Sequence, residues 1–202
     1  MTIVHLVRHG VTEHTGYKLS GWMEGLHLTE EGRGQAEAAA ERLSDIRFKA
    51  IYSSPLERCY ETADIIAGQH QGLRVKKLRA IGEVDYGRWT DRSMKVLSKT
   101  KLWSTVQRFP SQVRFPEGET LRAVQARAVE AVEELVTRHP KQHICCATHA
   151  DVIKLVVVHY LGAHLDMYQR LLVAPGSITV LGLGEGEPRV IALNHVPSKG
   201  SL

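Results

Sequence analysis

Short, uninterrupted runs of apolar residues recur along the chain and predict β-strands buried in a sheet. These runs cover residues 3–7, 49–52, 74–78, 143–147, 177–183 and 189–195. A segment rich in glycine and glutamate, 184–188, separates the last two runs, and no helical pattern follows it. We therefore expect a hairpin there rather than a nucleotide-binding loop.

Apolar residues at helical spacing occupy the stretches between most of these strands. The predicted helices cover residues 29–43, 54–67, 119–139 and 152–161. Thr29 is expected to cap the first helix, and Ser54 is expected to cap the second, with Pro55 at its first position. Alternating strands and helices predict an α/β fold, a three-layer sandwich with a mostly parallel central sheet and helices on both faces.

The stretch from 80 to 119 breaks this alternation. It holds two short helical patches, 93–99 and 102–109, among helix breakers. It is too long for a simple connection, so we expect an irregular helical cap over the carboxyl edge of the sheet. The length of 202 residues, 43% of them apolar, is expected to form one domain, 1–202, that carries this cap as an insertion.

Composition indicates the expected compartment of the protein and bears on membrane and metal binding. No apolar run approaches the roughly 20 residues that cross a membrane, and no leader pattern precedes the first strand. Two of the three cysteines, Cys145 and Cys146, are adjacent within a predicted strand, as expected for reduced thiols in a cytoplasmic protein. The histidines and cysteines show no metal-binding spacing, so we expect no metal.

Charge is concentrated in the middle of the chain. The formal net charge is +4, and residues 74–122 hold twelve lysines and arginines against five acids. This excess fits an anionic small molecule, although a solvated helical face without a role explains it equally well. No motif or alternation of basic and aromatic residues indicates nucleic acid as a partner.

Basic residues follow three predicted strands, and they carry the chemical prediction. Arg8 and His9 end the first strand, Arg58 lies in the first turn of the next helix, and His149 follows a later strand. The carboxyl ends of parallel strands meet at one edge of a sheet, where α/β proteins hold ligands. We therefore expect these four side chains to surround a phosphate group.

The residue types suit the transfer of a phosphoryl group. A neutral His9 can attack phosphorus and form a phosphohistidine, and Arg8 and Arg58 can neutralise the phosphate oxygens. His149 can donate a further hydrogen bond, and Glu83 can protonate the departing oxygen. Taken singly, each arginine is better explained by a surface ion pair, His149 by a hydrogen bond at a strand end and Glu83 by solvation.

Several blocks of sequence match those of a known family. They are Leu6-Val7-Arg8-His9-Gly10-x-Thr12, Gly21-Trp22, Leu28-Thr29-x-x-Gly32-x-x-Gln35-Ala36, Ser53-Ser54-Pro55-x-x-Arg58-x-x-x-Thr62-Ala63, Glu83-x-x-Tyr86-Gly87-x-Trp89, Phe115-Pro116-x-Gly118-Glu119 and Thr148-His149. With these blocks the chain resembles the histidine phosphatase superfamily, in its phosphoglycerate mutase-like branch and of the phosphatase type, over almost its whole length.

The resemblance implies roles for individual residues. By it, His9 is the phosphorylated nucleophile, Arg8, Arg58 and His149 form the phosphate pocket, and Glu83 is the proton donor and later the base for water. It also implies contacts with substrate at three further positions, and no metal or organic cofactor. Those three substrate-binding positions are Thr15, Gly21 and Ala150.

The chain departs from the family pattern around the predicted pocket. Thr15 stands where many members carry an asparagine, and Ala150-Asp151 stands where two glycines are common. Lys154 replaces a frequent arginine, and Asp91 a frequent glycine. Asp151 is expected either to cap its helix or to weaken the binding of highly charged substrates.

Two groups of side chains in the predicted cap have alternative roles. The aromatic residues either line an apolar pocket or form the small core of the cap itself. They are Trp89, Trp103, Phe109 and Phe115. Four basic residues are candidates for binding a second anion. These are Arg88, Lys95, Arg108 and Arg114.

Three functions remain in competition. A phosphomonoesterase acting on a small phosphorylated metabolite is favoured, because the chain is short and the block after Glu83 is of the Tyr-Gly-x-Trp kind. A phosphoglycerate-type mutase would use the same histidine, and a catalytically silent phospho-ligand binding protein is the third. Sugar or glyceric acid phosphates and the late nucleotide-loop phosphate of cobalamin assembly are candidate substrates. The expected partner is a small phosphate ester, with no nucleic acid or membrane, and a homodimer is the expected assembly.

Overall fold

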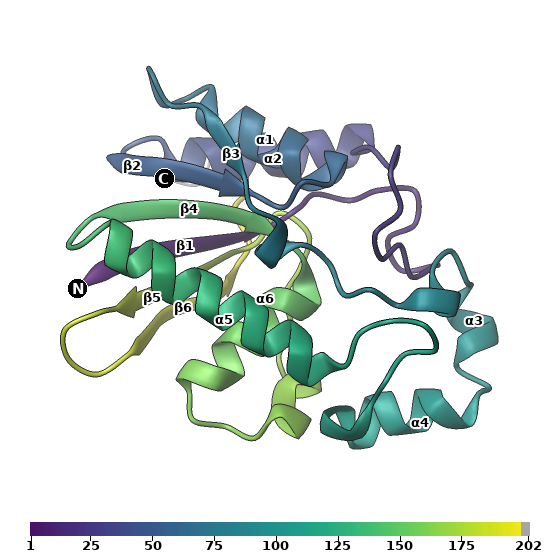
Figure 1. Cartoon of the computed structure of the whole chain (residues 1–202). Coiled ribbons are helices and arrows are strands. Elements are labelled where there is room, and N and C mark those ends of the chain that lie inside the picture. The colour runs from purple at the N-terminus through teal and green to yellow at the C-terminus, as the bar shows by residue number, and fades with distance from the viewer. Residues whose placement is uncertain (199–202) are drawn as a thin grey trace.

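A six-stranded sheet organises residues 1–198, the part of the chain that the computed structural model describes. The strands lie in the order β3-β2-β4-β1-β5-β6 (Figure 1). Their bounds are Thr2–Arg8 for β1, Phe48–Ser53 for β2, Val75–Lys77 for β3, His143–Thr148 for β4, Ile178–Leu183 for β5 and Arg189–His195 for β6.

The central strands are parallel, as the alternating pattern predicts. β1 pairs with β4, β4 with β2 and β2 with β3, all in parallel. β5 runs antiparallel to β1 and forms the expected hairpin with β6. The parallel strands therefore end at one common edge, and the register places Arg8 of β1 beside Thr148 of β4.

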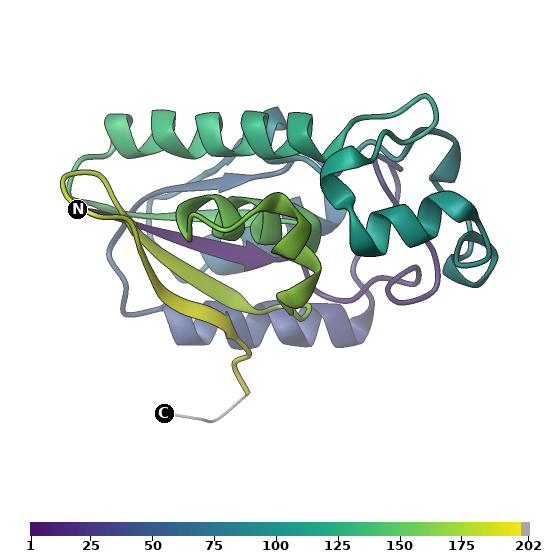
Figure 2. The same cartoon turned by 90° about the horizontal axis from the view of Figure 1, so that it is seen from below.

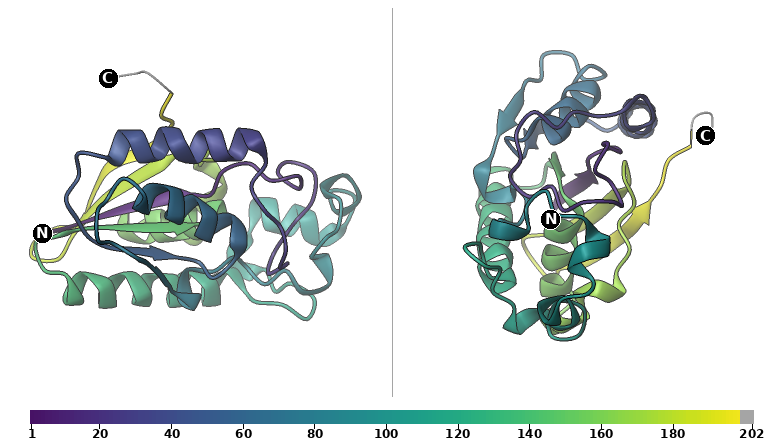
Figure 3. Two further views of the ribbon diagram at one scale, coloured as in Figure 1. Left: turned by 90° about the horizontal axis from the view of Figure 1, so that it is seen from above. Right: turned by 90° about the vertical axis from the view of Figure 1, so that its right-hand side faces the viewer.

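Helices cover both faces of the sheet and complete the three layers. α1 (Glu30–Leu43) and α2 (Glu57–Ala67) pack on one face, and α5 (Leu121–Arg138) and α6 (Ala150–Tyr160) pack on the other. Figure 2 and the left panel of Figure 3 show α1 and α5 on opposite sides of the strands. The predicted fold class is confirmed. No helix among residues 1–198 is long and apolar enough to cross a membrane.

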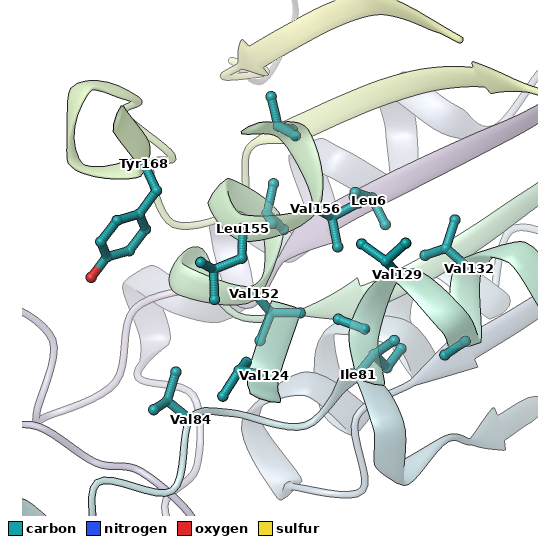
Figure 4. Close-up of a cluster of buried hydrophobic side chains, with 14 of the residues drawn as sticks. Leu6, Ile81, Val84, Val124, Val129, Val132, Val152, Leu155, Val156 and Tyr168 are labelled. Carbon is teal, nitrogen blue, oxygen red and sulfur yellow. The ribbon is translucent and has the colours of Figure 1, made fainter. Parts of the chain in front are cut away.

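Alternation along the strands divides the core into two clusters. Leu6 faces α5 and α6, where it packs among Val129, Val132 and Val156 (Figure 4), whereas Val7 faces α1 and α2. The adjacent cysteines of β4 follow the same rule, because successive side chains of a strand point to opposite faces. Cys145 belongs to one cluster and Cys146 to the other, and both thiols are free.

The segment from 80 to 119 forms the expected cap. It contains α3 (Met94–Leu97) and α4 (Lys101–Arg108), with short 3₁₀ turns before α3 and after α4. Figure 1 shows this segment beyond the ends of β1 and β4, at the right of the view. Trp89 and Phe115 pack together with ring centroids 5.5 Å apart and are almost fully buried. These aromatic side chains join the cap to the hydrophobic cluster beneath α5 and α6.

Three helix boundaries differ from the sequence prediction. Thr29 caps α1 as expected, but α2 begins at Glu57 with Leu56 as its N-cap. Ser54 lies three residues before the helix, and its hydroxyl is hydrogen-bonded to His149 Nε2 at 2.9 Å and accepts from the Leu56 N–H at 3.4 Å. Asp151 does not cap α6, whose N-cap is His149. α5 begins two residues later than predicted, after the N-cap Thr120.

Candidate active site

A cavity of about 470 Å³ lies at the carboxyl edge of the sheet, beneath the cap. Arg8, His9, Arg58 and Glu83 all line it. These four side chains therefore meet in one cavity, although they come from the end of β1, the first turn of α2 and the start of the cap. His149 is fully buried next to it, with its ring centroid 5.3 Å from that of His9.

The end of β1 fixes the orientation of His9. Its Nδ1 lies 2.7 Å from the carbonyl oxygen of Gly10, and a carbonyl can only accept, so Nδ1 carries the proton. Nε2 is therefore the basic nitrogen of the ring. A Cβ on Gly10 would lie 2.2 Å from the carbonyl oxygen of Gly32 in α1, so only glycine permits this turn.

The imidazole of His9 is held in its neutral form. Burial and the positive charges of Arg58 and Arg8 lower its pKa well below the ordinary value, and the bond to Gly10 opposes this only in part. A neutral imidazole has a free lone pair at Nε2 and can act as a nucleophile. The surrounding arginines therefore favour the reactive form of His9.

Backbone carbonyl groups hold the two arginines in place. Arg8 Nη1 donates to the carbonyl oxygen of Val173 at 2.7 Å, and Arg58 Nη2 donates to that of Gly21 at 2.7 Å. No carboxylate among the described residues forms an ion pair with either guanidinium. Their positive charges are thus available to an anion in the cavity, although Arg58 is almost fully buried.

The N-terminal ends of α2 and α6 add to this positive environment. The N-cap residue of each helix makes no side-chain hydrogen bond to the first turn. Ala150 and Arg58, in those first turns, line the cavity. Helix N-termini attract anions through their free N–H groups and their dipoles, so both ends favour phosphate at this place.

His149 connects the phosphate end of the cavity to Glu83. Its Nδ1 lies 3.4 Å from Glu83 Oε2, and its Nε2 is hydrogen-bonded to Ser54. Burial and the charge of Arg58 lower the pKa of His149 well below its ordinary value. A neutral ring that donates from Nδ1 and accepts at Nε2 from the Ser54 hydroxyl satisfies both contacts.

A network of hydrogen bonds fixes the backbone around Glu83. Arg127 of α5 donates to the carbonyl oxygens of Ala80, Gly82 and Glu83 at 2.7–2.9 Å. Trp22 Nε1 also donates to the Glu83 carbonyl, at 2.6 Å. Arg127 is in turn paired with Glu119, whose second oxygen accepts from the Asp85 N–H at 2.9 Å. Glu83 is therefore held rigidly although it lies outside any regular helix or strand.

Glu83 has the acidity of a proton donor near neutral pH. Burial, supported by the negative charge of Asp151, raises its pKa to about 7, against the opposing effect of Arg58 and Arg8. A carboxyl group that stays protonated near pH 7 can donate to a departing oxygen.

The three further positions that the resemblance implies differ in placement. Thr15 lines the cavity, and its hydroxyl accepts from the Thr12 N–H at 2.9 Å. Ala150 also lines it. Gly21 is buried behind Arg58 and accepts its hydrogen bond, so its visible role in the structure is to position that guanidinium.

Asp151 and Lys154, both from α6, line the same cavity. Tyr86 donates to Asp151 Oδ2 at 2.9 Å, and Lys154 Nζ lies 3.5 Å from Oδ1. Lys154 also donates to Gln169 at 3.4 Å and lies 5.5 Å from the centre of the Tyr168 ring. The sequence gives no sign of this arrangement beyond the unusual residue types at 151 and 154.

The cap supplies the apolar part of the lining. Trp89, Trp103 and Phe115 line the cavity, as one of the two alternatives expects, but Phe109 is exposed and lies outside it. None of the four basic cap residues lines the cavity, so the structure gives no support to a second anion site built from them. Arg88, Lys95, Arg108 and Arg114 are all exposed.

Arg127 is the main residue that sequence reasoning missed. It lies inside a helix with two other arginines, Arg122 and Arg138, and nothing in its spacing separates it from a solvated side chain. Among residues 1–198, no group of three or more His, Cys, Asp or Glu side chains could hold a metal ion.

The family resemblance is confirmed by comparison with known proteins. Residues 4–196 match the model of the histidine phosphatase superfamily (branch 1). The chain belongs to this superfamily. It is thus an enzyme of the phosphatase or mutase type.

The individual relatives include both phosphatases and mutases. The chain is 31% identical to phosphoserine phosphatase 1 of Hydrogenobacter thermophilus, over 94% of this chain and 90% of that protein. It is 29% identical to the 2,3-bisphosphoglycerate-dependent phosphoglycerate mutase of Thermoplasma acidophilum, over 100% and 96%. The solved structure of Bacillus stearothermophilus YhfR superposes with a TM-score of 0.90 at 26% identity, covering 97% and 98% of the two chains.

Proposed function

We propose that this protein is a phosphomonoesterase that hydrolyses a small phosphorylated metabolite through a phosphohistidine on His9. One observation carries the proposal above the others. The neutral imidazole of His9, with Nδ1 bonded to Gly10, shares one cavity with two arginines that form no ion pair among the described residues and with Glu83, whose pKa burial raises to about 7.

The first step of the proposed reaction transfers the phosphoryl group to the protein. Nε2 of His9 attacks phosphorus, and the bond between phosphorus and the ester oxygen breaks. Arg8 and Arg58 neutralise the phosphate oxygens, and His149 completes the pocket behind them. Glu83 gives its proton to the departing alkoxide, which leaves as an alcohol.

The second step releases phosphate. Glu83, now ionised, accepts a proton from water as the water oxygen attacks the phosphohistidine. The bond between phosphorus and Nε2 breaks, and its electron pair returns to the ring. Protein groups supply attack, charge neutralisation and proton transfer, so we propose that the reaction requires no metal.

The mutase reaction is the second candidate, because the Thermoplasma relative covers the whole chain. It would use the same His9, but would return the phosphoryl group to a substrate oxygen instead of to water. The relatives called phosphoserine phosphatase favour hydrolysis. A cytoplasmic location is consistent with the three free, buried thiols and stays a prediction.

A ³¹P NMR time course with 3-phosphoglycerate and a panel of phosphomonoesters, in the presence of a metal chelator, tests the proposal. We expect free phosphate from one or more esters with the natural protein and with His164→Ala, a control at an exposed histidine outside the cavity. We expect none with His9→Ala. Conversion of 3- to 2-phosphoglycerate without comparable phosphate release would make the protein a mutase, and no reaction with any ester would contradict the proposal.

A further inference from the structure

The cations that line the cavity fall into two kinds. Arg8 and Arg58 contact backbone carbonyl groups and are free to bind the phosphate that is to be removed. Apart from them, the lysines and arginines among residues 1–198 that line the cavity are Lys18 and Lys154. Any second anionic group on a substrate would have to find its partner in this pair of lysines.

Both lysines are already paired with aspartates. Lys18 Nζ lies 2.8 Å from Asp91 Oδ1 at the outer rim, where both side chains are more than 40% exposed and the attraction is screened. Lys154 Nζ lies 3.5 Å from Asp151 Oδ1 in the wall of the cavity, where both side chains are largely buried. The inner pair contributes no net charge to the place where a leaving group would lie.

The position of Asp151 is fixed from two sides. Tyr86 donates to one carboxylate oxygen, and Lys154 lies beside the other. Tyr86 itself is held by the cap, where its ring packs edge-on against Phe115 at 5.0 Å. Asp151 therefore cannot turn away from the cavity without leaving the Tyr86 hydroxyl without its partner, a change that costs stability.

We infer that Asp151 is a specificity-determining residue that makes the site select phosphomonoesters with a neutral or cationic leaving group and discriminate against those carrying a second anion. A carboxylate or second phosphate beside the ester would lie against Asp151 with Lys154 already neutralised. A hydroxyl or ammonium group could instead donate to Asp151. This inference rests on the phosphomonoesterase activity proposed above.

The inference also separates hydrolysis from the mutase reaction. A mutase of the kind that depends on 2,3-bisphosphoglycerate must hold two phosphates and a carboxylate in one site. Two arginines can neutralise a single phosphate dianion, and the remaining cations of this cavity are compensated. A site of this charge favours substrates with one phosphate and no other anion.

Two esters that differ in a single group provide the test. Glycerol phosphate and 3-phosphoglycerate have the same length and hydroxyl group, but one ends in CH₂OH and the other in a carboxylate. We expect kcat/KM to favour glycerol phosphate by about tenfold or more, as for like charges close together in a partly buried site. O-phosphoethanolamine, which carries an ammonium group, should be at least as good a substrate as glycerol phosphate.

Substitutions should move this preference in opposite directions. Asp151→Asn should reduce the ratio of the two kcat/KM values about tenfold, mainly by lowering KM for 3-phosphoglycerate. Lys154→Met, which leaves the charge of Asp151 uncompensated, should increase the ratio of kcat/KM for glycerol phosphate to that for 3-phosphoglycerate. Glu117→Gln, at the exposed ion pair with Arg88 outside the cavity, is the matched control and should leave it nearly unchanged. Any effect of Asp151 on Glu83 acts on both esters alike and cancels in the ratio.

The outcomes distinguish this inference from the proposed function. An equal or better rate with 3-phosphoglycerate in the natural protein, or an unchanged ratio in Asp151→Asn, would overturn the role of Asp151 while phosphatase activity stands. No phosphate release from any ester would instead overturn the proposed function and remove the basis of the inference.

Discussion

The two halves of the cavity use positive charge in opposite ways. In the phosphate half, Arg8 and Arg58 are held by carbonyl oxygens and have no acidic partner among the described residues. In the leaving-group half, Lys18 and Lys154 are each paired with an aspartate. A carbonyl group orients a cation and leaves its positive charge in place. A carboxylate orients the cation and also cancels its charge. The first half is therefore suited to binding an anion and the second to discriminating against another one.

The largest expected effect is at the nucleophile. His9→Ala should lower kcat for every phosphate ester by about 10⁴-fold or more, because no other group can form the phosphoenzyme. Initial rates of phosphate release measure this loss. Circular dichroism should show an unchanged fold. A residual rate within about tenfold of the natural protein would mean that another residue attacks phosphorus.

The phosphate half should be the more sensitive to the loss of a cation. Arg58→Ala should reduce kcat/KM about a hundredfold or more for all esters, as when one preorganised donor is removed from a charge-stabilising site. Arg108→Ala, at an exposed cap residue outside the cavity, is the matched control and should be nearly silent. Similar losses in both variants would show that general surface charge, rather than the pocket, attracts substrate.

Glu83 lies where the two halves meet, so its loss should depend on the leaving group. Glu83→Gln should slow alkyl phosphates about a hundredfold or more in kcat/KM and activated aryl phosphates far less, because a good leaving group needs no proton. Steady-state kinetics with one ester of each kind measures the difference. Equal losses on both esters would argue against Glu83 as the acid.

The pH dependence of the natural protein should show the same difference. Because the pKa of Glu83 is raised to about 7, its proton is lost as the pH rises through 7. Values of kcat/KM for an alkyl phosphate should then fall about tenfold per pH unit above that point, and those for an activated aryl phosphate should not. His9 stays neutral well below pH 6.5, so protonation of the nucleophile should not limit the rate near that pH. A decline in kcat/KM above pH 7 that is identical for both esters would contradict the assignment of Glu83 as the acid.

The smallest expected effect is at the residue that positions Glu83. Arg127→Lys keeps the charge, but an ammonium group cannot reproduce the bonds of the guanidinium to three carbonyl groups and Glu119. We expect a loss of about tenfold in kcat for alkyl phosphates, with KM nearly unchanged. The pH above which kcat/KM falls should also shift. Arg122→Lys, on the same helix, is the matched control. A uniform loss on aryl and alkyl esters would indicate a purely structural role.

The sequence predicts where the side chains of the phosphate half lie, because they stand at or near the ends of regular elements. Arg8 and His9 follow β1 directly, and His149 follows β4, so the register of parallel strands brings them to one edge. The place of Glu83 after the third strand and the family block around it predict its position at the same edge. The fold class followed from the same alternation of strands and helices.

The leaving-group half could not be predicted, since it depends on contacts between distant segments. The pairing of Lys154 with Asp151 lies within one helix turn, but the Tyr86 bond that fixes Asp151 spans sixty-five positions of sequence. The Ser-Pro pair predicts a helix cap at Ser54, whereas the structure places its hydroxyl against His149, which is ninety-five positions away in sequence. The roles of all the site residues, the single domain and the homodimer stay predictions.

Direct detection of the phosphoenzyme tests the central claim. Glu83→Gln protein should be mixed with an activated aryl phosphate, quenched rapidly and digested for mass spectrometry, because loss of the base should slow hydrolysis of the intermediate and let it accumulate. We predict one phosphoryl group on the peptide that contains His9, labile in acid and stable in base, and absent when His9→Ala is combined with Glu83→Gln. Phosphate release without any modified His9, or a phosphoryl group on another residue, would contradict the account.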